Sequence, residues 1–139
     1  MLILDTNHTQ EISRGSPAGI RLLNRLRESG DSVATTIISA EEHLRGWMTE
    51  IRKRSKPEDQ VEPYRRMLTT MEFYSAWLVL PWDFEAAALF SLHRAGGVRI
   101  GSMDLKIACI ALAHEAIVLT RNRVDFSQVP GLRYENWLD

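Results

Sequence analysis

Short apolar runs that end in polar residues recur along the chain and predict the strands of a buried sheet. The first run begins at Leu2 and is stopped by Asp5-Thr6-Asn7, which is typical of a strand whose carboxyl end delivers polar groups to a surface crevice. The predicted strands cover residues 2–5, 32–36, 78–80, 117–120 and 132–134. Since helical segments alternate with these strands, the pattern predicts a parallel sheet.

Capping and helix-breaking residues predict the helices between the strands. Ser16-Pro17 starts a helix that Gly30 ends, and Pro57 separates two long helices in the middle of the chain. The predicted helices cover residues 17–29, 39–55, 58–77, 84–95 and 102–115, with Ser39, Asp83 and Ser102 as the starts of three of them. Right-handed crossovers then place helices on both faces of the sheet. The expected fold is α/β, with three layers (α/β/α), a central parallel sheet and a protruding helical pair formed by residues 39–77.

Length and composition fit one compact domain covering residues 1–139. The chain has 139 residues, 45% hydrophobic and 25% charged, so it can fold without disulfides or a structural metal. Cys109 is the only cysteine, which excludes an internal disulfide and a cysteine-based zinc site and favours a reducing, cytoplasmic setting. No apolar run approaches the roughly 20 residues that cross a bilayer. Asp5 would interrupt a signal peptide, so the mature chain is expected to begin at Met1.

The distribution of charge says more than the net charge of −1. Arginines and lysines concentrate between Arg45 and Arg66, where glutamates could pair with them on a solvated helical face. Arg45 is the exception, because it lies about one helical turn from Glu42. We expect Arg45 at the rim of an acidic pocket, in contact with a phosphate.

Four carboxylates lie where a predicted strand ends or a predicted helix begins: Asp5, Glu42, Asp104 and Asp125. Each of the last three also has a structural explanation, as a capping-box glutamate after Ser39, as an acid near a helix N-terminus, and as a turn residue. Asp5 is different, because a carboxylate next to an apolar strand loses hydration and needs a cation or several donors. Since the carboxyl ends of parallel strands gather at one edge, we expect all four in one crevice.

This set of ligands favours Mg2+ or Mn2+, hard ions that prefer carboxylate oxygen and water to histidine or cysteine. The histidines show no ligand spacing. We expect Asp5 and Asp104 to hold one ion, Glu42 to coordinate or to act as the base through a bound water, and Asp125 to help with a second ion. Without metal, the four charges should repel one another and raise their pKa values.

Short polar residues beside these acids are expected to orient the carboxylates or bound waters. They are Thr6, Asn7, Thr120 and Asn122. Divalent cations held in this way suit phosphodiester hydrolysis, because they activate water and neutralise charge on the phosphorus oxygens and on the leaving oxygen.

The order of these acids along the chain, with the residues around them, resembles the pattern of the PIN-domain family, particularly the VapC-type toxin ribonucleases. The family's first metal ligand is matched by Asp5 in Leu-Asp-Thr-Asn, its glutamate by Glu42 four residues before a glycine, and its central aspartate by Asp104 before Ile-Ala. Near the end, Thr-Arg-Asn-x-x-Asp-Phe-x-x-Val-Pro-Gly-Leu completes the pattern. Many members have an aspartate where this chain has Asn122, so Asp125 is expected to take over part of that role.

The resemblance implies a PIN-like fold and a metal-dependent endoribonuclease, the toxin of a type II toxin–antitoxin pair. It further implies an RNA substrate, a cognate antitoxin and a homodimer, with Arg45 as a contact to the RNA or to the antitoxin. Asn122 keeps open an alternative, a catalytically weak PIN-fold RNA-binding or scaffold protein. A phosphoacceptor signalling domain and a haloacid-dehalogenase-type phosphatase are disfavoured, because Asp5-Thr6-Asn7 lacks the second acid that both require.

Overall fold

A five-stranded parallel sheet forms the centre of the computed structural model, which describes all 139 residues. The strands are β1 (Leu2–Leu4), β2 (Val33–Thr36), β3 (Val79–Leu80), β4 (Ile117–Leu119) and β5 (Arg133–Glu135). Their order across the sheet is β3-β2-β1-β4-β5, and every neighbouring pair is parallel. β1 is therefore the middle strand, so the residue that follows it lies at the centre of the sheet's carboxyl edge.

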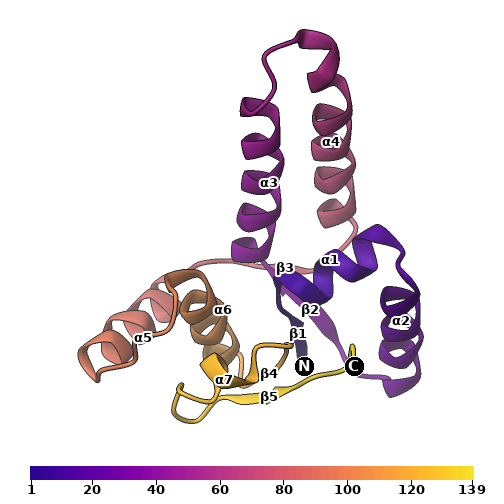
Figure 1. Cartoon of the computed structure of the whole chain (residues 1–139). Coiled ribbons are helices and arrows are strands. Elements are labelled where there is room, and N and C mark those ends of the chain that lie inside the picture. The colour runs from indigo at the N-terminus through magenta and orange to yellow at the C-terminus, as the bar shows by residue number, and fades with distance from the viewer.

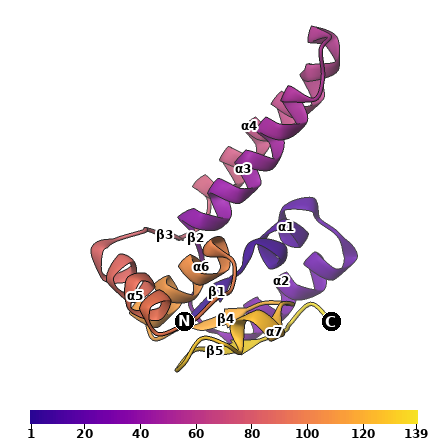
Figure 2. The same cartoon turned by 60° about the vertical axis from the view of Figure 1, so that its left-hand side comes forward.

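Helices cover both faces of the sheet (Figures 1 and 2). They are α1 (Thr6–Arg14), α2 (Pro17–Ser29), α3 (Ile37–Arg52), the 3-10 turn η1 (Pro57–Gln60), α4 (Val61–Ser75), α5 (Phe84–Ala95), α6 (Ser102–Ala113) and α7 (Arg123–Phe126). None of these helices combines the length and the apolar character needed to span a membrane.

Successive side chains of the strands point to opposite faces of the sheet, so the hydrophobic core has two parts. Ile3 and Val118 pack in the larger cluster with residues of α5 and α6. Leu2, Leu4 and Leu119 point to the other face and pack with leucines of α2. The two clusters confirm the predicted three-layer α/β/α fold.

The protruding helical pair is also confirmed. α3 and α4 run side by side away from the sheet and form an arm (Figures 1 and 2). Polar contacts join them near the base, where the Trp47 indole N–H donates to Thr70 at 2.9 Å and His43 Nδ1 lies 3.4 Å from the Tyr74 hydroxyl.

Two helices were not predicted. α1 begins directly after β1, and its residues Thr6 to Gln10 are polar, so the segment looked like a loop rather than an amphipathic helix. α7 is a single short turn that starts after Asn122. The predicted helix over 58–77 is divided into η1 and α4.

One predicted helix start and one predicted helix cap were wrong. α3 begins at Ile37, and the Thr36 side chain caps it by accepting from Ser39 N–H at 3.2 Å. The predicted capping box between Ser39 and Glu42 therefore does not form, because the helix starts earlier. α6 begins at Ser102, as predicted, but Ser102 is its first residue rather than its cap, and the preceding Gly101 provides no side-chain cap.

Candidate active site

A cavity of about 240 Å³ lies where β1 and β4 deliver their carboxyl ends, and no hydrophobic residue lines it. Its lining consists of three carboxylates and four polar side chains: Asp5, Glu42, Asp104, Thr6, Asn7, Gln10 and Asn122. Three of the four predicted acids thus share one cavity. Asp125 is not part of the lining, but its carboxylate accepts a hydrogen bond from Asn122.

Asp5 is held in place by α1. The residue is 4% exposed and caps the helix, so its Oδ1 accepts from the backbone N–H of His8 at 2.9 Å. The fully buried His8 ring brings Nδ1 within 3.1 Å of the same oxygen. Because His8 Nε2 accepts from the Trp137 N–H at 3.4 Å, the tautomer with its proton on Nδ1 satisfies both contacts. Oδ2 of Asp5 is left without a hydrogen bond from the protein.

Glu42 reaches the cavity from the second turn of α3. The Thr6 hydroxyl donates to Glu42 Oε1 at 2.6 Å, and Ser39 Oγ lies 3.2 Å from the same hydroxyl. Thr6 belongs to α1, so this hydrogen bond links the two helices on either side of the cavity. The second oxygen, Oε2, receives no hydrogen bond from the protein.

Asp104 and Asp125 share one donor. The Asn122 amide nitrogen donates to Asp104 Oδ2 at 3.1 Å and to Asp125 Oδ2 at 2.9 Å. Thr120 Oγ1 in turn accepts from the Asn122 backbone N–H at 2.9 Å and fixes the turn after β4. Oδ1 of Asp104 receives no hydrogen bond from the protein.

The pKa of Asp104 is raised above its ordinary value of 3.8. Burial is the main cause, and the negative charges of Glu42, Asp5 and Asp125 add to it, while the hydrogen bond from Asn122 opposes the shift. The predicted mutual repulsion of the acids is therefore confirmed at Asp104. The cavity carries negative charge that its own side chains do not neutralise.

The three carboxylates that line the cavity share one arrangement. In Asp5, Glu42 and Asp104, the protein fixes one oxygen and leaves the other free. The three side chains are nevertheless too dispersed for direct ligation by all of them, since no group of three or more His, Cys, Asp or Glu residues has the geometry of a metal site. One or two of these carboxylates are enough for a divalent cation that keeps several of its waters.

The match with known proteins covers nearly the whole chain. The model of the PIN domain family matches residues 2–132. This chain belongs to the PIN domain family. A protein named Ribonuclease VapC2 from Haemophilus influenzae is 26% identical over 98% of this chain and 97% of its own length.

Two further PIN-domain relatives agree with this assignment. A tRNA(fMet)-specific endonuclease VapC from Salmonella typhimurium is 32% identical over 84 residues, which are 58% of this chain and 64% of that protein. The crystal structure of DNA-bound VapBC from Salmonella typhimurium matches with a TM-score of 0.75 and 26% identity, over 98% of this chain and 97% of that one.

Asn122 places a neutral amide between two acids of the site. A carboxylate at this position could not donate to Asp104 and Asp125, whereas the amide nitrogen donates to both. The neutral amide thereby reduces the repulsion in the cavity. Of the four residues predicted to orient the acids or waters, Thr6 and Asn122 donate to carboxylates. Thr120 accepts from the Asn122 backbone and contacts no acid, and Asn7 lines the cavity without a side-chain hydrogen bond.

Arg45 does not lie at the rim of this cavity. Its guanidinium pairs with Glu41 at 2.5 Å, and the side chain is 62% exposed. Glu41, one turn earlier on α3, is a nearer partner for Arg45 than the acidic cavity. The sequence could not show which face of α3 Arg45 occupies.

The sequence analysis missed His8 and Gln10. His8 was set aside because its spacing did not suggest a metal ligand, but it contacts Asp5 rather than a metal. A helix over residues 6–14 places His8 one turn from Asp5 and Gln10 one turn from Thr6, which is the signal that could have identified both.

Proposed function

We propose that this PIN domain, residues 1–139, is a divalent-metal-dependent endoribonuclease. The observation that supports the proposal is the arrangement of Asp5, Glu42 and Asp104 around one polar cavity, each with one fixed and one free oxygen. PIN-domain ribonucleases generally depend on divalent metals, and a relative matched over nearly its full length is named a ribonuclease. The hard oxygen ligands favour Mg2+ or Mn2+.

In this proposal, Asp5 and Asp104 are the residues that would hold the cation. A bound divalent ion supplies an activated water and neutralises charge on the phosphate. Glu42 keeps its orientation through Thr6, so its free oxygen can accept the proton of the attacking water. Asn122 keeps Asp104 facing the cavity, and Asp125 acts through Asn122. A second ion would call on Asp125, which does not line the cavity.

Cleavage of RNA by the purified chain tests the enzymatic proposal. We expect cleavage with Mg2+ or Mn2+ and none with excess chelator. Asp5→Asn and Asp104→Asn should each lower kcat by at least about a hundredfold, since each removes a charged cation ligand. Asp31→Asn, which changes an exposed aspartate far from the cavity in the sequence, is the matched control. Undiminished cleavage in both site variants would contradict the mechanism.

The scaffold alternative gives a different result. A PIN fold without catalytic activity should bind no Mn2+ in a manner that depends on Asp5. Isothermal titration of the wild type and Asp5→Asn with Mn2+ therefore separates the two functions without relying on an RNA substrate.

We also propose that the chain is the toxin of a type II toxin–antitoxin pair, acting in the cytoplasm, with an antitoxin as its partner and a homodimer as its assembly. The support is its motif pattern and its similarity to VapC and to VapBC. Expression alone should arrest growth, and co-expression with a small DNA-binding protein encoded beside it should relieve the arrest. Growth unaffected by an active wild-type enzyme would contradict the toxin role. Sedimentation of the purified chain measures its mass in solution and so tests whether it is a homodimer.

A further inference from the structure

A second cavity, of about 390 Å³, lies next to the acidic one between α1 and the arm. Gln10 and Glu42 line both, so the two cavities are contiguous. The volume falls within the range of roughly 300–1,000 Å³ that is typical of small-ligand sites. A ligand that occupies it would therefore extend directly into the acidic cavity.

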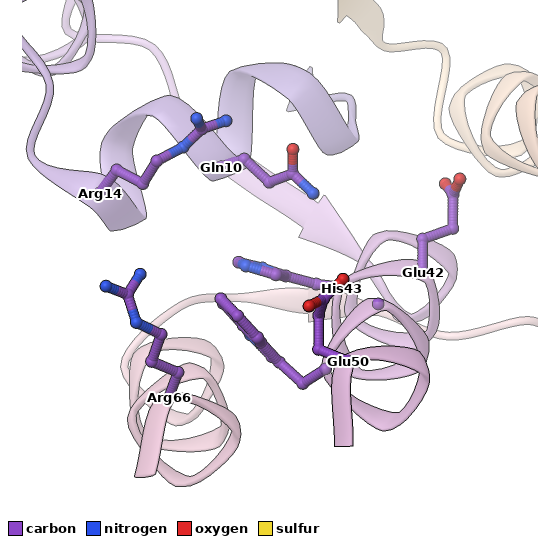
Figure 3. A pocket seen from close by; sticks show the side chains of 8 residues that line it. Gln10, Arg14, Glu42, His43, Glu50 and Arg66 are labelled. Atoms are coloured by element: carbon purple, nitrogen blue, oxygen red, sulfur yellow. The ribbon is translucent and has the colours of Figure 1, made fainter. Parts of the chain in front are cut away.

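Cationic side chains reach this second cavity from two elements. Figure 3 shows Arg14 from α1 and Arg66 from α4 on opposite sides, with the His43 ring extending between them. Arg14 Nη2 is 3.7 Å from its nearest carboxylate oxygen, on Glu11, which is too far for a hydrogen bond. Arg66 donates to Glu62 through Nε, at 2.9 Å, and its terminal amino groups make no hydrogen bond. Both guanidinium groups keep donors for an anion.

The two acids of this cavity differ in their partners. Glu50 accepts from Lys53 at 3.2 Å and from Arg54 at 2.9 Å, which balances its charge. Glu42 lies at the border with the acidic cavity and accepts only from the neutral Thr6 hydroxyl, so it keeps its negative charge there. The positive charge of the lining comes from Arg14 and Arg66.

Neutral groups complete the lining. The Gln10 amide makes no hydrogen bond within the protein, and His43 Nε2 is not bonded. Trp47 forms an aromatic wall that its hydrogen bond to Thr70 holds in place. An anion, a planar group with hydrogen-bonding edges and an aromatic contact are together the requirements of a nucleotide.

We infer that this cavity binds the unpaired nucleotide adjacent to the phosphodiester cleaved in the acidic cavity. Arg14 and Arg66 contact its phosphate, and Gln10 and His43 contact the edge of its base. The inference rests on the proposed ribonuclease function and adds a determinant of substrate specificity to it. Single-stranded RNA suits this site, because only an unpaired base can enter a cavity of this size beside the cleavage point.

A binding experiment tests the inference without cleavage. Metal-free protein is titrated with nucleoside monophosphates and, separately, with inorganic phosphate, and the indole N–H signals are followed by NMR. We expect the Trp47 signal to shift with nucleotides, while the Trp82 and Trp137 signals stay in place. The double variant Arg14→Gln/Arg66→Gln should abolish the shift. Arg65→Gln is the matched control, because Arg65 also pairs with Glu62 but does not line the cavity.

Steady-state cleavage of a single-stranded RNA oligonucleotide gives the second measurement. The double variant should raise KM about tenfold and change kcat less than about twofold, as expected for lost uniform binding. Arg65→Gln should leave both constants unchanged.

Two results would overturn the inference. The first is an equal Trp47 shift with inorganic phosphate and with nucleotides, which would show a site for anions alone. The second is a wild-type KM in the double variant. A wild type that cleaves no RNA would instead contradict the proposed function, and the titration would still be interpretable.

Discussion

Asp5 combines a structural and a chemical task in one side chain. Its Oδ1 caps α1 and contacts His8, while Oδ2 faces the cavity. Two donors on one oxygen fix the orientation of a carboxylate that is 4% exposed. Of these donors, the His8 ring is the one that a substitution can remove without breaking the helix cap.

Replacing His8 should weaken metal binding. His8→Leu removes the ring donor to Asp5 and should raise the Kd for Mn2+ about tenfold, the usual scale for a lost contact to a metal ligand. His8→Asn places an amide donor near the position of Nδ1 and should restore much of the affinity. Isothermal titration with Mn2+ measures both, and circular dichroism confirms the fold. Equal affinity in the Leu variant and the wild type would show that the ring only fills space.

At the scale of elements, the packing of α1 against α2 positions the acidic cavity. A Cβ atom added at Gly19 would lie 2.0 Å from the backbone oxygen of Glu11, so only glycine allows the two helices to approach this closely. α1 carries Thr6 and Gln10 to the cavity and begins at Asp5. Separation of α1 from α2 would therefore also disturb the site.

Gly19→Ala should destabilise the protein by about 1–3 kcal/mol or more, because the clash is with backbone rather than with a flexible side chain. Gly46→Ala is the matched control. Gly46 also lies in a helix, but a Cβ there meets nothing within 4 Å, so alanine should stabilise by up to about 1 kcal/mol. Urea unfolding measures both, and equal effects would contradict the close approach of α1 and α2.

Glu11, which lies at the same contact between α1 and α2, makes the free energy of unfolding depend on pH. The hydrogen bond from Ser16 is the main cause that holds the pKa of Glu11 below its ordinary value of 4.5, and Arg14 and Arg121 add to the effect. A carboxylate whose pKa is lower in the folded state stabilises the fold above the unfolded-state pKa and loses that contribution as the pH falls through the folded-state value.

Acid unfolding should therefore be less steep in Glu11→Gln. Between about pH 6 and pH 3, the wild type should lose more free energy of unfolding than the variant, because only the wild type must protonate Glu11. Urea titrations across this range measure the difference. Glu28→Gln, at an exposed glutamate of α2, should keep the wild-type slope. Parallel slopes in Glu11→Gln and the wild type would show that Glu11 makes no such contribution.

At the scale of the whole molecule, folding brings acids from distant parts of the chain together and pays a cost for it. The raised pKa of Asp104 means that the folded state disfavours its charge relative to the unfolded state. A divalent cation should reverse this cost by binding only the folded protein.

Thermal unfolding should therefore depend on metal. Mg2+ or Mn2+ at one hundred times its Kd should stabilise the wild type by about 2.7 kcal/mol and raise Tm by several degrees. Asp104→Asn should melt higher than the wild type without metal, because the repulsion is reduced, and should gain much less from metal. Scanning calorimetry with and without chelator measures the four values. An equal gain in both proteins would place the stabilising ion elsewhere.

Much of this protein follows from its sequence. Apolar runs that end in polar residues identify the strands, and alternating strands and helices require a parallel sheet whose carboxyl ends meet. Asp5 at the end of an apolar strand marks the site, because burial of its charge needs compensation. Local patterns suffice for these features, since strand periodicity and turn chemistry act over a few residues.

Tertiary structure decided the rest. Whether Asp125 or Asn122 lines the cavity depends on how the turn after β4 closes, and the amide is placed there, with donors for both acids. Arg14 and Arg66 meet across a cavity only because α1 packs beside the arm. Contacts between residues far apart in sequence depend on the angles at which helices pack, and no local periodicity encodes those angles.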